Sequence, residues 1–430
     1  GSIAMDSLRI SAGVDSYPRL GDRVYAAPHS FIANLPKFME AAEAEASHVL
    51  LKLGSIDVAP ESYVSVKPEK LFGRHCAILG ATGGGKSWTT ARIIEECLRY
   101  KTKIILLDAT GEYRGFDGEH VANFHLGAPV NTAKSSAPCT LPQTSFIESD
   151  FIALFEPAGK VQGPKLRAAI RSLRLAALAP HVATGGIIKK IDQSKVPIMT
   201  EEAKAGIAEK LDDPQQAFDV WKLVSQIEQE CVYPDGFGSA RGQKDFTKWG
   251  GDSGEVSFCL SLMSRINGIL SSSSFECVFK SKAPALTEKI SSFVSNEDRL
   301  LRICLSGVAF EFKAREIVAN VIGRHLLNMA RNGAFKSRPV VVIVDEAHNF
   351  LGRQIGADDA VARLDAFELI AKEGRKYGLN ICLSTQRPRD ITEGVLSQMG
   401  TLVVHRLTND RDREVVERAC GEIDRSASSF

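Results

Sequence analysis

The sequence predicts an α/β fold with a parallel sheet, preceded by a small β-rich domain and interrupted by a mostly helical insertion. Short apolar runs alternate with stretches of helical periodicity over residues 75–108, and the same alternation returns from residue 300. Apolar strands that are joined through helices pair in parallel, in a sheet covered on both faces. Between these two blocks, residues 119–299 show only helical or weak periodicity.

Three parts are therefore expected along the chain. Residues 5–70 contain short apolar patches separated by prolines and glycines, which predicts a small β-rich, barrel-like domain. Residues 71–118 and 300–425 are expected to form the α/β core, and residues 119–299 the helical insertion. The expected core strands are 76–79, 104–107, 302–305, 340–344, 380–384 and 401–405; the expected helices include 165–179, 201–211, 214–230, 314–330 and 360–377.

Composition excludes several classes of protein. The chain has 430 residues, of which 44% are hydrophobic and 24% charged, so collagen-like, low-complexity and mainly disordered chains are excluded. The formal net charge is only +1, so any nucleic-acid contact must depend on local basic clusters. The nine cysteines are scattered without CxxC spacing, which is typical of reduced thiols in the cytoplasm. The apolar runs are shorter than the roughly 18 to 20 residues that cross a bilayer, so we expect no membrane span.

Residues 80–87, GATGGGKS, match the P-loop pattern GxxxxGK[ST] and lie between a predicted strand and a predicted helix. Glycines let backbone N–H groups surround phosphates, Lys86 places a charge on the β and γ oxygens, and Ser87 offers a hydroxyl to Mg²⁺. This context predicts a RecA-like P-loop NTPase core that binds ATP and Mg²⁺. The alternative is a glycine-rich turn without a ligand. The expected nucleotide-binding residues are Thr82, Gly83, Gly84, Gly85, Lys86 and Ser87.

Two further motifs predict the hydrolytic groups. The apolar run at residues 339–344 is followed by Asp345 and Glu346, as in a Walker B motif. Asp345 would hold Mg²⁺ and Glu346 would polarise the attacking water, unless both merely cap the next helix. Gln386 follows the next predicted strand and could contact the γ-phosphate or its water, or else satisfy loop backbone.

The string DEAH at residues 345–348 does not make this chain a DEAH-box helicase. Such helicases need two tandem motor lobes, and the sequence after Glu346 is too short for a second lobe. We therefore interpret His348 as a surface or loop histidine rather than a catalytic one.

Taken together, these motifs resemble the HerA family of hexameric ATPases, within the HerA/FtsK group of DNA pumps. The resemblance covers residues 71–413 and rests on the P-loop segment GRHCAILGATGGGKS, on LDATGEY at 107–113, on the Walker B strand, on EGRKYGL at 373–379, on STQRP at 384–388 and on RLTN at 406–409. Residues 5–70 are similar to a shortened form of the β-barrel that precedes the motor in this family.

The resemblance assigns roles to individual residues. It implies that Lys86, Ser87, Asp345, Glu346 and Gln386 form the ATP site, and that Asp108 and Glu112 lie beside the nucleotide. It also implies that Arg74 and Arg375 complete the site of a neighbouring subunit, where a guanidinium would stabilise the charge that grows on the γ-phosphoryl group. An arginine in the last turn of a helix, as expected for Arg375, is also favoured by the helix dipole alone.

Two basic clusters are candidates for contacts with double-stranded DNA. Arg167, Arg171 and Arg174 repeat at helical spacing, which places them on one helix face. Arg241, Lys244 and Lys248 lie on a glycine-rich loop between residues 234 and 254. In a ring, such clusters would be multiplied by the number of subunits. Either cluster could instead be a solvated face or part of a subunit interface.

Two functions of different classes follow from the resemblance. The first is a hexameric motor that translocates double-stranded DNA together with a nuclease or similar effector on its N-terminal domains, in DNA end processing or antiphage defence. The second is an ATP-gated ring scaffold that regulates a partner enzyme, either a nuclease or a sirtuin-like NADase. A membrane-anchored pump of the FtsK kind is disfavoured by the lack of an apolar span.

Overall fold

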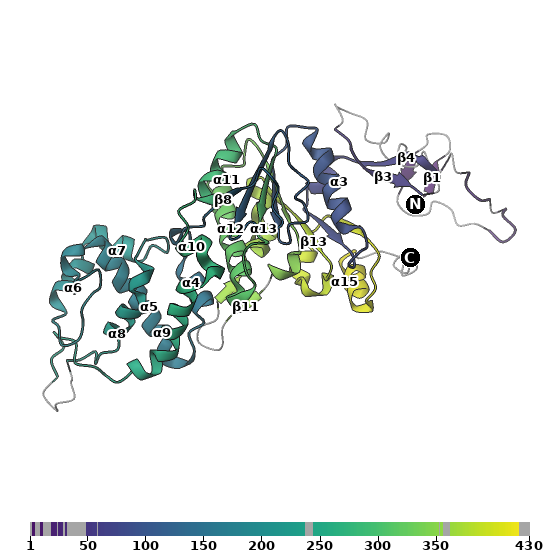
Figure 1. Cartoon of the computed structure of the whole chain (residues 1–430). Helices are drawn as coiled ribbons and strands as arrows, with labels where there is room; N and C mark the ends of the chain where they lie inside the picture. Colours follow the sequence, from purple (N-terminus) through teal and green to yellow (C-terminus); the bar gives the residue numbers. More distant parts are fainter. Residues whose placement is uncertain are drawn as a thin grey trace.

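The computed structural model describes residues 2–4, 9–11, 19–23, 25–28, 31, 49–57, 59–236, 244–351, 353–355 and 362–420. Its centre is an eight-stranded sheet in which all neighbouring strands are parallel (Figure 1). The strand order is β14-β5-β13-β10-β6-β9-β7-β8. The bounds are β5 Cys76–Leu79, β6 Ile104–Asp108, β7 Val121–Leu126, β8 Ala137–Cys139, β9 Leu300–Cys304, β10 Val340–Val344, β13 Leu379–Thr385 and β14 Thr401–Val404. The prediction of an α/β fold with a parallel sheet is confirmed.

Both faces of the sheet are buried, and β6 shows how the sequence achieves this. Successive side chains of a strand point to opposite faces, so Ile104 and Leu106 pack with α3 (Lys86–Leu98), which contributes Ile93. Ile105 and Leu107 join the core on the opposite face, together with residues of α12 (Ala314–Arg331) and α13 (Ala366–Glu373). A run of four apolar residues is required because neither face meets water.

The sheet extends further than the sequence suggests, because β7 and β8 lie within residues 119–299, where a helical insertion is expected. β7 pairs with β9, and β8 forms the edge of the sheet. Only part of β7 is buried and β8 has three residues, so neither shows the continuous apolar run of a central strand. We propose to place the start of the helical insertion after β8.

Helices make up most of the remaining insertion, and α5 to α9 extend away from the sheet at one end of the molecule (Figure 1). The bounds are α4 Glu148–Phe155, α5 Gly159–Leu178, α6 Val196–Glu202, α7 Ala205–Leu211, α8 Leu223–Glu230, α9 Val256–Ser271, α10 Glu276–Phe279 and α11 Leu286–Ser295. The helix expected at 214–230 begins later, because the Asp219 side chain accepts a hydrogen bond from the Trp221 N–H at 3.0 Å and caps the turn before α8.

The elements in the C-terminal part of the core also differ from those expected. The helix expected at 360–377 is shorter: β12 (Ala362–Leu364), which pairs with β11 (Arg353–Ile355), precedes α13, and a 3-10 turn at Gly374–Tyr377 follows it. Gly378 then adopts a positive φ of 79° before β13, a conformation that favours glycine. The short α14 (Glu393–Leu396) and then β14 and α15 (Asp410–Cys420) complete the described chain.

The described N-terminal residues form two antiparallel pairs, β1 (Ser2–Ala4) with β2 (Arg9–Ser11) and β3 (Leu51–Ile56) with β4 (Ala59–Val66), followed by α2 (Pro68–Phe72). The Glu96 carboxylate of α3 accepts a hydrogen bond from the Lys52 N–H at 2.9 Å, which ties β3 to the core. Much of residues 5–70 lies outside the described residues, so the barrel-like domain stays a proposal.

Candidate nucleotide-binding site

The P-loop follows β5 at the carboxyl edge of the sheet and leads into α3. Gly83 and Gly85 adopt positive φ angles of 75° and 95°, and this left-handed backbone explains the need for glycine there. Gly80 is needed for space, since a Cβ on it would lie 2.6 Å from the His405 Cβ. The loop surrounds a cavity of about 370 Å³ that is lined by Thr82, Lys86, Ser87, Glu346 and Gln386, among others.

Adjacent strands bring the hydrolytic groups to the same cavity. Glu346 follows β10 and Gln386 follows β13, which separates β10 from the P-loop strand. Lys86 Nζ lies 3.5 Å from Glu346 Oε1 and 3.8 Å from Asp345 Oδ1. Gln386 donates to Glu346 Oε2 at 3.1 Å, and Thr82 donates to Gln386. The residues that the sequence assigns to phosphate and water therefore form one connected cluster.

Glu346 has a strained backbone, with φ 49° and ψ 43° in the left-handed region. Such a conformation costs a non-glycine residue of order 1 kcal/mol and persists only where the surroundings enforce it. Here it turns the carboxylate out of the strand direction toward Lys86 and Gln386. The strain is consistent with a positioned catalytic base.

Asp345 is buried beside Lys86, with 1% of its surface exposed. Burial raises the pKa of its carboxyl to about 7; Lys86 opposes the rise, while Glu346, Asp108 and Glu112 add to it. Ser384 Oγ donates to Asp345 Oδ1 at 3.2 Å, and Oδ2 is a buried oxygen without a hydrogen-bond partner among the described residues. This geometry leaves one carboxylate oxygen available to a cation.

These oxygens fit Mg²⁺, which prefers hard oxygen ligands and is usually held by one or two protein groups together with phosphates. Ser87 and Asp345, the predicted ligands, would hold it. No group of three or more His, Cys, Asp or Glu side chains in the described part of the chain could hold a metal by itself. Phosphate oxygens would therefore have to complete the coordination.

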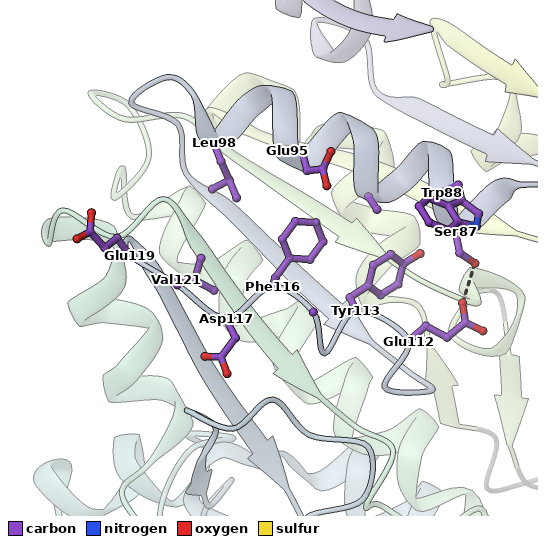
Figure 2. Close-up of a pocket in the computed structure, with 13 residues that line it drawn as sticks. Ser87, Trp88, Glu95, Leu98, Glu112, Tyr113, Phe116, Asp117, Glu119 and Val121 are labelled. Carbon is purple, nitrogen blue, oxygen red and sulfur yellow. Dashed lines mark hydrogen bonds between the residues drawn. The ribbon is translucent and has the colours of Figure 1, made fainter.

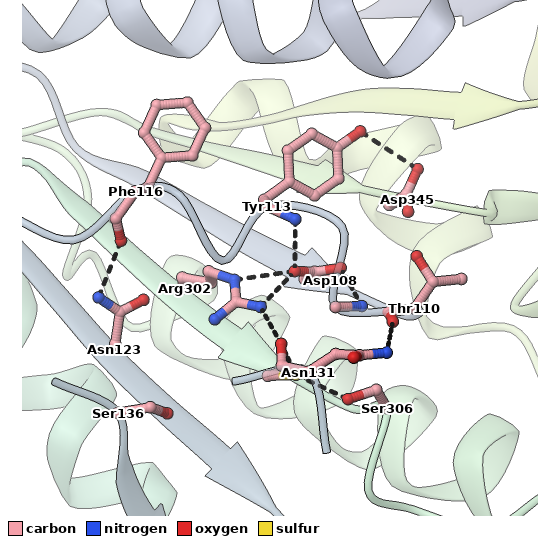
Figure 3. Close-up of polar contacts among 12 residues, drawn as sticks. Asp108, Thr110, Tyr113, Phe116, Asn123, Asn131, Ser136, Arg302, Ser306 and Asp345 are labelled. Atoms are coloured by element: carbon pink, nitrogen blue, oxygen red, sulfur yellow. Dashed lines mark hydrogen bonds and ion pairs between the residues drawn. The ribbon is translucent and has the colours of Figure 1, made fainter. Parts of the chain in front are cut away.

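The other two predicted nucleotide residues lie at the end of β6 and in the loop after it, and they have different roles. Asp108 is the last residue of β6, and its contacts are shown in Figure 3. Glu112 lines the cavity and accepts a hydrogen bond from Ser87 Oγ at 2.6 Å. Asp108 does not line it: its buried carboxylate is paired with Arg302 at 2.7 Å and accepts the Gly111 and Tyr113 N–H groups at 2.7 and 3.1 Å. The prediction that Asp108 contacts nucleotide is therefore corrected to a role in holding the loop.

Sequence analysis missed three polar side chains near the cavity, Tyr113, His348 and His405. The Tyr113 hydroxyl donates to Asp345 Oδ1 at 3.5 Å. His348 lies in a 3-10 turn after β10, as expected of a loop histidine, but it is buried, with Nδ1 3.3 Å from Glu346 Oε2, so it is not a surface residue. His405 packs against the P-loop glycines, and burial lowers its pKa. His348 and His405 come soon after β10 and β14, and this position could have indicated their contacts; Tyr113 lies further along the loop after β6 and gave no such signal.

Arg74 and Arg375 lie at the opposite edge of the sheet. Arg74 precedes β5 and Arg375 lies in the turn before β13, so both are at the amino ends of strands whose carboxyl ends carry the P-loop and Gln386. They line a cavity of about 310 Å³ together with Lys372 and Lys376. Neither arginine can reach the nucleotide site of its own chain.

The predicted DNA-binding residues differ in whether their side chains are exposed. Arg174 is buried and donates to the backbone carbonyls of Leu211 and Pro214, so the prediction that it contacts DNA is wrong. Arg167 and Arg171 are exposed on α5 and paired with Glu148 and Asp212 at 3.2 and 2.6 Å. On the glycine-rich loop, Lys244 and Lys248 are exposed, whereas Arg241 lies outside the described residues.

Part of the sequence is similar to a known protein family. The family model described as "Helicase HerA, central domain" matches residues 51–222. A probable helicase of Methanocaldococcus jannaschii is 21% identical over 85% of this chain, and the DNA double-strand break repair helicase HerA of Saccharolobus solfataricus is 22% identical over 80%. The chain spans 63% and 57% of the lengths of these relatives.

Among solved structures, VirB4 of Thermoanaerobacter pseudethanolicus aligns with 90% of both chains, at 13% identity and a TM-score of 0.44. No helix among the described residues combines the length and the apolar character needed to cross a membrane. The residues that match the family model include the P-loop and Glu112, which line the phosphate cavity. Over residues 51–222 the chain is similar to the central domain of the HerA helicases.

Proposed function

We propose that this chain binds and hydrolyses ATP with Mg²⁺. The observation that carries the proposal is the cluster of Lys86, Asp345, Glu346 and Gln386 around one cavity at the carboxyl ends of three neighbouring strands. Lys86 and the P-loop amides would hold the phosphates, and Glu346, held by Gln386, would accept the proton of the attacking water. Mg²⁺ on Ser87 and Asp345 would neutralise phosphate charge.

The experiment separates nucleotide binding from hydrolysis. Lys86→Ala removes the charge that faces the phosphates and should abolish tight MgATP binding. Glu346→Gln keeps the shape of the side chain but removes the base, so binding should persist while turnover falls at least about 100-fold. Nucleotide affinity and phosphate release are measured on both variants, with Lys372→Ala at the far edge as a charge-matched control for Lys86. Normal turnover in Glu346→Gln would refute the assignment of the base.

For the whole protein we propose a hexameric motor that translocates double-stranded DNA with a nuclease or similar effector, in DNA end processing or antiphage defence. Similarity to the HerA family over residues 51–222 supports this, together with Arg74 and Arg375, which lie at the edge of the sheet opposite their own nucleotide site and would serve a neighbour's. The Saccharolobus relative is named as a DNA double-strand break repair helicase. We further propose a cytoplasmic location, since the eight cysteines whose side chains are described are buried free thiols.

The second candidate is a ring whose ATP state gates a partner enzyme, a nuclease or a sirtuin-like NADase, without productive translocation. The ion pairs on α5 favour it, because basic side chains already paired with carboxylates contribute less to DNA binding. Displacement of a third strand from duplex DNA, measured with wild type and Glu346→Gln, distinguishes the two. ATP-dependent displacement supports the motor; DNA-independent ATPase without displacement supports the gated ring.

A further inference from the structure

A second and larger cavity adjoins the phosphate site. It has a volume of about 730 Å³ and lies between α3 and the loop after β6 (Figure 2). Ser87, Trp88 and Glu112 line both cavities, so they form one continuous surface. The volume is in the range of small-molecule sites. A ligand whose phosphates occupy the P-loop could therefore extend into this second cavity.

Trp88 stands at the boundary between the two cavities. It directly follows Ser87 in the first turn of α3, and 83% of its side chain is exposed. Exposed large aromatic side chains next to a ligand cavity mark interaction sites, since the ring has a face that can stack. Behind it, Tyr113 and Phe116 lie along the loop that faces α3 (Figure 2). The cavity thus offers aromatic surface on both sides.

The charges of the lining residues define what this cavity can hold. Glu95, Asp117 and Glu119 carry carboxylates at it, and none of the described residues that line it is a lysine or arginine. An anionic group is repelled there, whereas the neighbouring cavity contains Lys86 and the P-loop amides. The preferred occupant is flat, uncharged and a hydrogen-bond donor through its ring or amino N–H groups.

From these observations we propose that the purine base of the bound nucleoside triphosphate occupies this cavity and stacks on Trp88. The proposal rests on the proposed function, because it places the phosphates of the same nucleotide on the P-loop. Stacking of a base on an aromatic ring contributes enough that its removal weakens binding from several-fold to about 100-fold. Glu95, whose side chain is 56% exposed and lies 3.7 Å from Arg92, is an acceptor for the base amino group, whereas Asp117 Oδ2 already accepts the Lys134 and Ser135 N–H groups.

The first test compares a ligand that has a base with one that lacks it. We expect Trp88→Ala to weaken MgATP binding about 10-fold and to leave binding of magnesium tripolyphosphate within twofold, with Trp88→Phe restoring most of the loss. Trp221→Ala is the matched control, since Trp221 is 50% exposed in the helical insertion. Equal losses for both ligands, or no loss for MgATP, would overturn the base site.

The second test uses fluorescence. The chain has three tryptophans, so Trp221→Phe combined with Trp249→Phe leaves Trp88 as the reporter. MgATP should quench its emission and tripolyphosphate should not; equal quenching by both would contradict stacking. If wild type binds neither ligand, the proposed function fails and the base site fails with it. If Trp88→Ala keeps its MgATP affinity but loses self-association, the indole belongs to an interface with a second copy, and the proposal is wrong.

Discussion

At the scale of single residues, the buried pair of Asp108 and Arg302 organises the loop that carries Glu112 and Tyr113. Both side chains are fully buried, and Arg302 also donates to the Asn131 carbonyl at 3.2 Å (Figure 3). A buried charge is costly without its partner, because desolvation is no longer offset. The pair therefore stabilises the positions of Glu112, which bonds Ser87, and of Tyr113, which bonds Asp345.

Asp108→Asn should lower the free energy of unfolding by about 3 kcal/mol or more, since it leaves Arg302 charged and buried. Asp212→Asn is a matched control: Asp212 also pairs with an arginine, at 2.6 Å, but is 79% exposed, and its loss should cost less than about 1 kcal/mol. Urea unfolding measures both. If both variants lost a similar free energy of unfolding, the burial of the Asp108–Arg302 pair would not be the source of its contribution to stability.

His75 gives the fold a predictable pH dependence. Burial lowers its pKa from 6.5 to about 4, with a smaller contribution from Arg375 and an opposing one from the Ala371 backbone. Its Nδ1 accepts the Ile381 N–H at 3.1 Å, so the folded state holds the neutral ring. The unfolded chain binds the proton more readily, and stability present above pH 6.5 is lost as the pH falls toward 4.

By this linkage His75 alone removes about 2 kcal/mol of stability between pH 7.5 and pH 5. In the His75→Asn variant, the free energy of unfolding should no longer show this loss of about 2 kcal/mol between pH 7.5 and pH 5. Asparagine tolerates the positive φ of 66° at this position, and its amide oxygen can still accept a hydrogen bond. Unfolding by urea at the two pH values, for wild type and variant, checks this. An unchanged pH dependence in the variant would assign the effect to other groups.

At the scale of elements, the turn between α13 and β13 presents a basic surface opposite the nucleotide site. Arg74, Lys372, Arg375 and Lys376 line one cavity there. Lys372 is paired with Glu368 at 2.7 Å, whereas no partner is found for Arg74 or Arg375 among the described residues. Exposed arginines without a partner, at the edge facing away from their own P-loop, are suited to the γ-phosphate of an adjacent subunit.

Arg375→Ala should therefore keep MgATP affinity within a few-fold of wild type while hydrolysis is lost. Mixed with Glu346→Gln, it should regain part of the activity, because some interfaces then combine an intact Arg375 with an intact Glu346. Steady-state phosphate release at varied mixing ratios measures the recovery, and Lys376→Ala provides a control in the same turn. Weak binding by Arg375→Ala alone, or mixed rings without recovery, would exclude the inter-subunit role.

At the scale of the whole molecule, the helical insertion projects from the sheet and carries the remaining candidates for DNA contact (Figure 1). Lys244 and Lys248 are 57% and 58% exposed; Lys244 lies 2.8 Å from Asp235, and Lys248 3.9 Å from Asp245. A net charge of +1 gives no general attraction to DNA, so binding must come from such local groups.

Replacing Lys244 and Lys248 with alanine should weaken binding to every duplex alike and reduce the slope of log affinity against log salt by roughly 0.9 per lost phosphate contact. ATPase activity without DNA should be unchanged, since the loop is remote in sequence from the P-loop. The matched comparison is Arg167→Ala with Arg171→Ala on α5. An unchanged slope for the lysines with a reduced slope for the arginines would move the contact to α5.

The sequence by itself determined the sheet strands that carry the motifs, and it predicted the residues that come together around the proposed phosphate site. Lys86, Ser87, Asp345, Glu346 and Gln386 were predictable because each follows an apolar strand, and parallel strands place their carboxyl ends at one edge. The P-loop glycines were predictable because a positive φ is a requirement of the local backbone, which glycine meets without steric cost, and it does not depend on distant residues.

Only the tertiary structure decided the contacts between residues far apart in the sequence. Asp108 and Arg302 are 194 positions apart in the sequence. No residue near either one indicates that the two side chains pair, or that Asp108 therefore does not line the phosphate cavity. Arg174 has the spacing of a surface arginine, yet α7 packs against α5 and buries it. Strand β7 and the edge strand β8 are held in the sheet by pairing with β9 and with each other rather than by an apolar pattern of their own. Packing between distant segments determines these contacts, so they cannot be predicted from the residue pattern of any single segment.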